Sequence, residues 1–255
     1  RTVTAFDRFA RATTETQASG LGFSRTKSQS YEDRFDSWVI GLPRVTTVAG
    51  INQADISYDS AGLPEQRSEY GQLIASYTYA SDGTLSTAKD GLNQITTLSS
   101  WQRGYPQRLD FSDTTFKTAV IDDNGWITSI TNELGDKSCF GYDGMGRLTS
   151  QTLPSETSVG VCDASAWTPT TWQFAQVNSA EYGVESGHWK RTESTGARSM
   201  ETFYDALWRP IFTRQSSSDA SVNVRTLRRR FDHAGREVFA SYPSGDVASY
   251  LTLAT

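Results

Sequence analysis

Five glycines recur at intervals of 21 residues through the middle of this chain, at Gly62, Gly83, Gly104, Gly125 and Gly146. A fixed period of this length indicates a chain built from copies of one supersecondary unit. One such unit cannot bury its apolar side chains alone, so neighbouring copies have to stack and share their packing. The repeat therefore constrains the fold more than any other feature of the sequence.

The residues ahead of each glycine show what kind of unit repeats. The fourth position before it holds Tyr58, Tyr79, Ser100, Ile121 and Tyr142, and the third holds Asp59, Ala80, Trp101, Asp122 and Asp143. Aspartate is favoured at the first position of a type I turn, where its carboxylate accepts backbone N–H groups. Glycine is favoured at the fourth position, where φ is positive. The pattern predicts a type I turn with a G1 bulge, which is a common hairpin connection.

We assign these residues a structural role in turns and predict no catalytic role for them. A later copy of the pattern, at 231–236, adds one more turn of the same kind. The predicted turn residues are Tyr58, Asp59, Gly62, Tyr79, Gly83, Gly104, Asp122, Gly125, Tyr142, Asp143, Gly146, Arg147, Asp232 and Gly235.

The segments between the turns have the composition of strands. Residues 126–131 and 147–152 are rich in Thr and Ser and lack the i, i+3, i+4 apolar spacing of a helix. A second turn signal lies about half a period later, at 89–92 and 132–135. Each copy therefore predicts two strands and two turns, and we expect an all-β fold of meandering antiparallel hairpins.

The regularity of the repeat divides the chain into four regions. We expect lead-in repeats at 1–49, five regular repeats at 50–154, an insertion or a strongly drifted pair of repeats at 155–200, and degenerate repeats at 201–255. In the last region Asp205 is followed by Trp208 where glycine is expected, so that turn is predicted to differ.

Charge argues against a nucleic-acid partner, and hydropathy argues against a membrane span. The formal net charge of −5 and the pI near 5.1 lack the basic footprint of a nucleic-acid-binding protein. The basic run Arg225–Arg230 is interpreted as a solvated strand face, with a phosphate-binding patch as the alternative. No stretch of eighteen apolar residues occurs, so we predict no membrane span.

Two cysteines, Cys139 and Cys162, are too few for a disulfide framework or a thiolate zinc site. They are either free, partly buried thiols or, in a secreted protein, one disulfide.

A search for catalytic patterns finds none that are complete. The chain has two histidines, His188 and His233, and neither belongs to a cluster with metal-ligand spacing. Asp122 and Asp123 are the obvious neighbouring carboxylates, but adjacent residues on a strand point to opposite faces. We therefore predict no enzyme activity, no metal and no cofactor.

The repeat resembles the YD repeats of the Rhs family, which also occur in teneurins and in the C components of insecticidal toxin complexes. Residues 142–149 are close to the family consensus, and residues 36–43 resemble a Trp-x-x-Gly-x-Pro element that precedes such repeats. The resemblance covers most of 1–154 and 201–255. The family's core motif with paired aspartates is not found here, so self-cleavage is not carried over to any residue.

The resemblance implies a spiralling β-sheet that forms part of a hollow shell around a C-terminal toxin. The expected partners are the remaining shell repeats of a longer parent chain, from which both ends look cut, and the enclosed toxin domain. The protein is then expected to be secreted or at the surface of a bacterium. The alternative is an adhesion module that binds carbohydrate or a cell-surface protein, for which Trp167, Trp172 and Trp189 are candidate contacts.

Overall fold

The computed structural model describes residues 2–165 and 168–245, and within them it contains β-strands and no helix. The chain divides into two compact units, Arg1–Thr118 and Ala119–Thr255. The division falls inside one strand, and each unit is built from hairpins.

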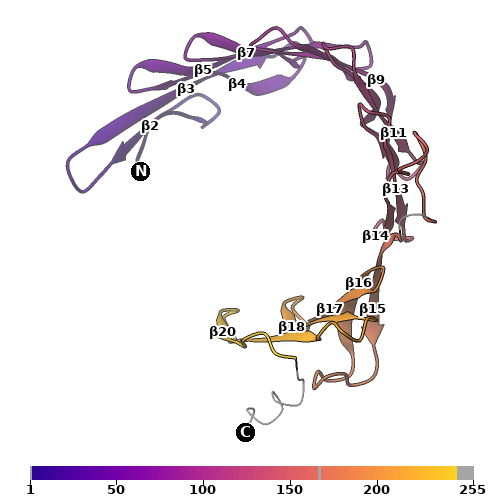
Figure 1. Ribbon diagram of the computed structural model, residues 1–255. Helices are drawn as coiled ribbons and strands as arrows, with labels where there is room; N and C mark the ends of the chain where they lie inside the picture. Colours follow the sequence, from indigo (N-terminus) through magenta and orange to yellow (C-terminus); the bar gives the residue numbers. More distant parts are fainter. Residues whose placement is uncertain (1, 166–167, 246–255) are drawn as a thin grey trace. The chain divides into compact units, whose positions relative to one another are not determined.

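The first unit is an antiparallel meander in which each strand pairs with the next one along the chain (Figure 1). Its strands are β1 (Thr2–Phe6), β2 (Ala12–Ala18), β3 (Ser24–Arg34), β4 (Val39–Val48), β5 (Ile51–Tyr58), β6 (Pro64–Glu69), β7 (Gln72–Tyr79), β8 (Leu85–Asp90), β9 (Ile95–Gln102), β10 (Tyr105–Asp110) and the start of β11 (Phe116–Ile121).

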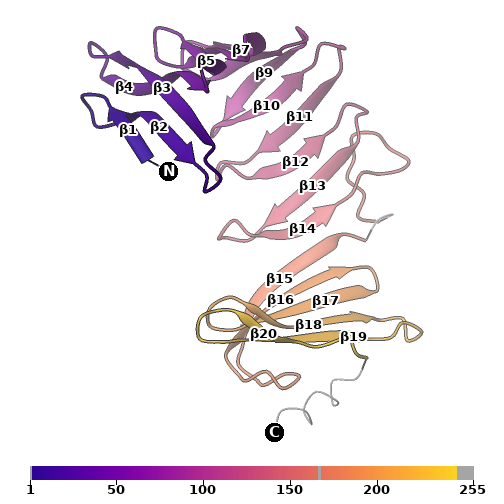
Figure 2. The same ribbon diagram turned by 90° about the vertical axis from the view of Figure 1, so that its left-hand side faces the viewer.

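The second unit continues the same pattern, and its strands lie side by side in Figure 2. They are β12 (Ile127–Thr131), β13 (Lys137–Tyr142), β14 (Leu148–Thr152), β15 (Thr170–Val177), β16 (His188–Thr195), β17 (Arg198–Tyr204), β18 (Pro210–Ser217), β19 (Arg225–Phe231) and β20 (Glu237–Ala240). The prediction of an all-β meander of antiparallel hairpins is confirmed.

Few side chains are buried, because a single layer of strands exposes both of its faces. Among the described residues the buried apolar side chains are Ile121, Val184, Phe203 and Phe212. The last three form one cluster in the second unit, to which Tyr182 adds a partly buried ring. The cluster exists because the connection between β15 and β16 places Tyr182 and Val184 against β17 and β18.

The irregular region predicted at 155–200 contains a regular hairpin with long connections. Strands β15 and β16 pair from Thr171↔Ser194 to Val177↔His188, and they also pair with β14 and β17. The meander therefore continues through the region in which the sequence period is lost.

Cys139 and Cys162 are joined by a disulfide, so the free-thiol interpretation is wrong. The connection after β14 turns back, with an isolated bridge between Pro154 and Cys162. This brings the Cα atoms of the two cysteines to 5.9 Å, which is within disulfide reach.

The predicted difference at the Trp208 turn is also wrong. The Trp208 N–H donates to the Asp205 carbonyl at 3.0 Å, as glycine does at the same position of the other turns. Trp208 takes a φ of 63°, in the left-handed region that favours glycine. Asp205 Oδ1 accepts the N–H groups of Leu207 and Arg209, each at 2.9 Å, so its carboxylate holds the turn without a glycine.

Candidate functional site

The Asp143 turn shows how the repeated pattern closes a hairpin. Asp143 Oδ1 accepts the backbone N–H groups of Met145 at 2.9 Å and Arg147 at 3.0 Å. Asp143 Oδ2 accepts the Arg147 Nε–H at 2.7 Å, so one carboxylate holds both the turn and the arginine after it. These bonds, first among them the one from the Arg147 backbone, lower the pKa of Asp143. Asp232 and Arg236 repeat the arrangement, and the pKa of Asp232 is lowered for the same reason.

Other predicted turn residues occupy equivalent positions. Asp59 and Asp122 each accept two backbone N–H groups through Oδ1, at 2.8–3.0 Å. The left-handed position is held by Gly62, Gly83, Gly125, Gly146 and Gly235, with φ values of 87°, 83°, 87°, 78° and 80°. The Gly83 turn lacks the first aspartate, and there Asp82 Oδ1 accepts the Thr84 N–H at 2.9 Å instead.

Gly104 keeps the period but lies in a different turn. It has a φ of 84° and follows Arg103, whose φ is 51°, and the pair joins Gln102 directly to Tyr105. Two consecutive left-handed residues are typical of a two-residue type I′ hairpin. Trp101 cannot supply a turn carboxylate, and it remains within β9.

The tyrosines of the repeat tie each hairpin to the strand before it, which the sequence analysis missed. The hydroxyls of Tyr58, Tyr79 and Tyr142 donate to the carbonyls of Pro43, Pro64 and Ile127, at 2.7–2.8 Å. The acceptor always lies 15 residues earlier, two positions after the glycine of the preceding copy. That fixed offset was available in the sequence as a signal.

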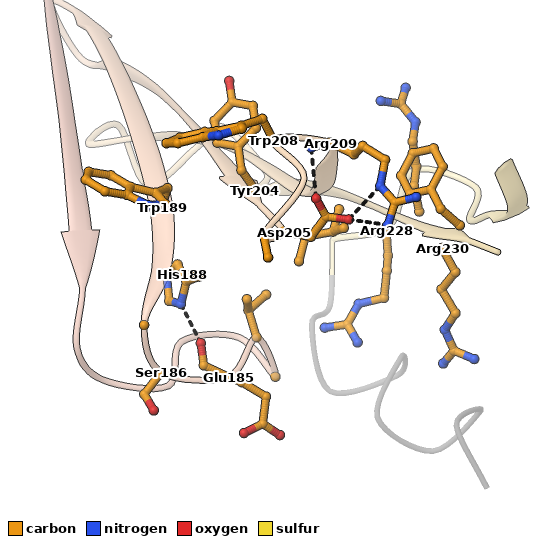
Figure 3. Close-up of a pocket in the computed structure, with 17 residues that line it drawn as sticks. Glu185, Ser186, His188, Trp189, Tyr204, Asp205, Trp208, Arg209, Arg228 and Arg230 are labelled. Carbon is orange, nitrogen blue, oxygen red and sulfur yellow. Dashed lines mark hydrogen bonds and ion pairs between the residues drawn. The ribbon is translucent and has the colours of Figure 1, made fainter. Parts of the chain in front are cut away.

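A groove of about 750 Å³ lies in the second unit, where the start of β16, the Asp205–Arg209 turn and the end of β19 meet (Figure 3). Seventeen residues line it, among them His188, Trp189, Tyr204, Trp208 and the run Arg228–Arg230. In Figure 3 the two tryptophans lie toward one side of the groove, and Arg228 and Arg230 toward the other. The groove therefore offers aromatic surface and cationic groups to one ligand.

Trp189 and Trp208 form the aromatic side, and Phe174, which is not part of the lining, stacks on both. Phe174 stacks on Trp189 with centroids 5.0 Å apart and planes 6° apart, and on Trp208 at 5.6 Å. The two tryptophans are 5.4 Å apart. Trp208 is 55% exposed, so about half of its surface remains open to a ligand.

The charged side of the groove is predominantly positive. Arg209 is paired with Asp205, with Nε 2.7 Å from Oδ2, and Arg228 donates to the Tyr182 carbonyl at 2.7 Å. Arg229 lies 3.4 Å from Glu237, and Arg230 is exposed. Together with Arg209, the arginines outnumber the two carboxylates of the lining, Asp205 and Glu185.

The histidines considered as catalytic candidates do not meet. His188 is buried, its Nδ1 lies 2.7 Å from the Glu185 carbonyl oxygen, and its Nε2 lies 3.6 Å from Glu181. His233 is an exposed residue of the Asp232 turn. Across the residues that the structure places, no three His, Cys, Asp or Glu side chains come together as metal ligands. No helix in that part of the chain is long and apolar enough to cross a membrane.

Two of the three tryptophans predicted as binding candidates are described, and Trp172 and Trp189 lie at different positions of the β15–β16 hairpin, opposite Glu193 and Gln176. Trp172 donates to Glu193 Oε2 at 2.9 Å, and Trp167 lies outside the described residues. Trp189 instead stacks with Phe174 and Trp208, and neither of those was predicted to bind a ligand.

Comparison with known proteins links part of the chain to one repeat family. Residues 122–158 match the family model of the RHS Repeat. No curated protein has a similar sequence.

Solved structures share the fold over most of the chain. A crystal structure of TcdB2-TccC3-TEV has a TM-score of 0.50 at 12% identity, covering 92% of this chain and 15% of that one. TcdB2-TccC3 without its hypervariable C-terminal region gives 0.49 at 15% identity, covering 92% and 12%. A Tc holotoxin pore of Photorhabdus luminescens gives 0.42 at 14%, covering 85% and 13%. This chain thus spans 12% to 15% of the length of these three chains.

Proposed function

Residues 122–158 are an RHS repeat, and from this premise we propose that the chain is a non-catalytic wall segment of an Rhs-type secreted protein. The wall encloses a toxin or another C-terminal polypeptide of the parent chain. Its partners are the neighbouring shell repeats and the enclosed polypeptide.

The observation that carries this proposal is the thinness of the structure. A compact domain of this length would bury roughly three quarters of its chain surface around a central core. Here the buried apolar side chains of the described residues are those of four residues. A sheet of this kind can separate the inside of a shell from the outside. Its turn residues allow the chain to add further strands to the sheet.

The proposal is tested in the parent protein by deletions that differ in strand number. Deleting 59–79 removes one full period, namely β6, β7 and their turns, and joins Tyr58 to the Ala80 turn. Deleting 70–79 removes β7 alone with its turn. Losing a single strand reverses the direction of every later strand. If the later strands are still added at the same edge of the sheet, the face of the sheet that pointed outward then points inward.

Protection of the enclosed polypeptide from protease is the readout. We expect it to survive the full-period deletion and to be lost in the single-strand deletion. Equal protection in both variants would contradict an enclosing role, because protection would then not depend on which face of the sheet points toward the enclosed polypeptide.

A second candidate function, carbohydrate binding by an adhesion module, is favoured by the groove at Trp189 and Trp208. Trp189 and Trp208 both line that groove, and Trp208 is 55% exposed, so its ring offers a flat apolar surface to a sugar.

A further inference from the structure

We infer that the two end strands of this chain are complementary, so that β20 of one copy pairs with β1 of a second copy, head to tail. The inference goes beyond the proposed function, because it concerns how such a sheet is extended and does not require an enclosed polypeptide. Three observations support it: a side-chain contact that recurs between adjacent strands, the exposure of its two halves on β1 and beside β20, and the direction of these two strands.

The recurring contact starts from the residue four positions after a turn aspartate and ends on a ring of the adjacent strand. The rings of Trp126, just before β12, and Tyr142, the last residue of β13, have centroids 5.5 Å apart. The guanidinium of Arg209, just before β18, lies 4.7 Å from the centre of the ring of Phe231, the last residue of β19. Two further turns place a guanidinium over a ring in the same way, Arg11 over Tyr31 at 4.5 Å and Arg147 over Phe174 at 5.1 Å.

Arg236 presents the cationic half of this contact beside β20. Its Nε lies 2.7 Å from the carboxylate of its turn aspartate, as in the turns of Arg147 and Arg209, so the guanidinium is already positioned. The Arg236 side chain is 80% exposed, whereas those of Arg147 and Arg209, which lie over a ring, are 43% and 26% exposed. Arg236 therefore offers its surface to a ring on one further strand.

Phe6 presents the aromatic half of the contact on β1. It is the last residue of that strand, and a register shift precedes its pair with Ala12. Tyr142 and Phe231 end their strands with the same kind of shift. Those two rings are partly buried, but Phe6 is 60% exposed. Phe6 therefore holds the position of a ring that receives an arginine or a tryptophan from an adjacent strand.

Strand direction brings these two halves together. Within the described residues, β20 pairs with β19 and β1 pairs with β2, so each has an edge that can receive another strand. When β1 of a second copy pairs antiparallel with β20, Phe6 at its end lies beside Arg236 at the start of β20. Tyr142 and Trp126 have this same relation where β13 pairs with β12.

A second copy suits this place because it supplies both an antiparallel edge and a ring at the required end. Pairing satisfies the backbone groups of both edges, and the guanidinium gains a cation–π contact. The contact joins two different surfaces, so it is heterologous and leaves a free head and a free tail. Copies are therefore added without closing the assembly at two.

Sedimentation velocity of the 255-residue chain tests the inference with two edge variants. The head variant carries Thr2→Lys and Thr4→Lys on β1, and the tail variant carries Val238→Lys and Ala240→Lys on β20, all at exposed positions. Charges on an edge disfavour strand pairing. We expect the wild-type chain to form species larger than a dimer and each variant alone to remain monomeric. An equimolar mixture should form dimers that contain one head variant and one tail variant.

Pairing between like ends gives a different result and would overturn the inference. If β1 pairs with β1, the tail variant dimerises alone; if β20 pairs with β20, the head variant does so. A wild-type chain that stays monomeric or stops at a dimer would also overturn it. Protease protection is measured in the parent protein and does not depend on contacts between copies, so failure here is distinguishable from failure of the enclosing role.

Matched point variants test the ring contact in the mixed dimer. Phe6→Ser in the tail variant and Arg236→Ser in the head variant should each raise the dissociation constant by about two- to fivefold. Phe23→Ser, at a residue that is 75% exposed in the turn after β2, and exposed Arg25→Ser should not. Arg236→Trp should retain the affinity, because Trp126 makes the same contact. Equal effects of Phe6→Ser and Phe23→Ser would refute the contact, and circular dichroism checks that each variant keeps its β structure.

Discussion

At the residue scale, the aspartate of each turn replaces interactions that a short loop cannot make by itself. Asp143 satisfies two backbone N–H groups and a guanidinium with one carboxylate, and Asp205 does the same in a turn without glycine. The carboxylate therefore holds the turn, while glycine removes the strain of its fourth position. The two requirements are separable, as the Trp208 turn demonstrates.

Two glycines of one turn allow the glycine requirement to be measured. Gly146→Ala should destabilise the protein by about 1–2 kcal/mol, because its φ is 78° and a Cβ there would lie 3.0 Å from the Trp126 ring. Gly144→Ala is the control, because nothing lies within 4 Å of its Cβ position. Urea unfolding of both variants measures the difference. Equal midpoints would show that the position with positive φ does not require glycine.

The tyrosine hydroxyls predict a loss of stability at alkaline pH. Burial raises the pKa of Tyr58, Tyr79 and Tyr142. A pKa that is higher in the folded state stabilises the protein below the pKa of the unfolded tyrosine, near 10, and this contribution is lost as pH rises through the folded value. Thermal unfolding between pH 8 and pH 11 should show this decline.

Replacing one of these tyrosines tests the hydrogen bond directly. Tyr142→Phe should cost about 1 kcal/mol, because it leaves the Ile127 carbonyl without its donor, and it should reduce the alkaline decline. Tyr105→Phe, at a residue that is 47% exposed, is the control. A decline that is unchanged in Tyr142→Phe would refute the contribution of that hydroxyl.

At the scale of elements, the long connections of the second unit supply buried packing and a covalent cross-link, which the regular hairpins lack. The connection between β15 and β16 covers Phe203 and Phe212 and builds the buried cluster. The connection after β14 is fastened by the disulfide to β13, and the Gly160 N–H donates to the Gly135 carbonyl at 3.0 Å.

The disulfide should contribute measurably to stability. It joins residues 23 apart in sequence, and closing a loop of that size stabilises the folded state by about 3 kcal/mol in the chain-entropy description. We expect a reductant to lower the unfolding midpoint of the wild-type protein. The double variant Cys139→Ser with Cys162→Ser should start at the lower midpoint and be insensitive to reductant; an unchanged wild-type midpoint would exclude the contribution.

At the scale of the whole molecule, β1 and β20 each pair with one strand within the part of the chain that the structure describes. Strand β1 pairs with β2 within its unit, and β20 pairs with β19. A strand with an unpaired edge is a template for another strand. In the proposed shell, neighbouring repeats take this place.

Edge pairing predicts concentration-dependent association of the 255-residue chain. Lysines at Thr2 and Thr4 of β1, both exposed, should weaken it, because edge charges disfavour pairing between chains. Gln66→Lys combined with Gln72→Lys, on the inner strands β6 and β7, adds the same charge and should not. Sedimentation velocity separates the two, and equal effects would attribute the change to charge alone.

The sequence by itself determined the class of structure and the positions of many of its bends. The 21-residue period, the aspartates and the glycines are local signals, and turn chemistry acts through neighbouring backbone groups. The sequence also predicted a different turn at Trp208, because the glycine is missing there. The carboxylate of Asp205 holds the usual turn without that glycine. The sequence predicted the common turn at Gly104, where the structure has a shorter, two-residue turn.

Only the tertiary structure decided which distant residues meet. The pairing of Cys139 with Cys162, the cover of Tyr182 over Phe203 and the stack of Trp208 on Trp189 and Phe174 join elements with no common period. Such contacts depend on how long connections fold back onto the sheet. That path is fixed by the packing of the whole unit and has no local pattern in the sequence.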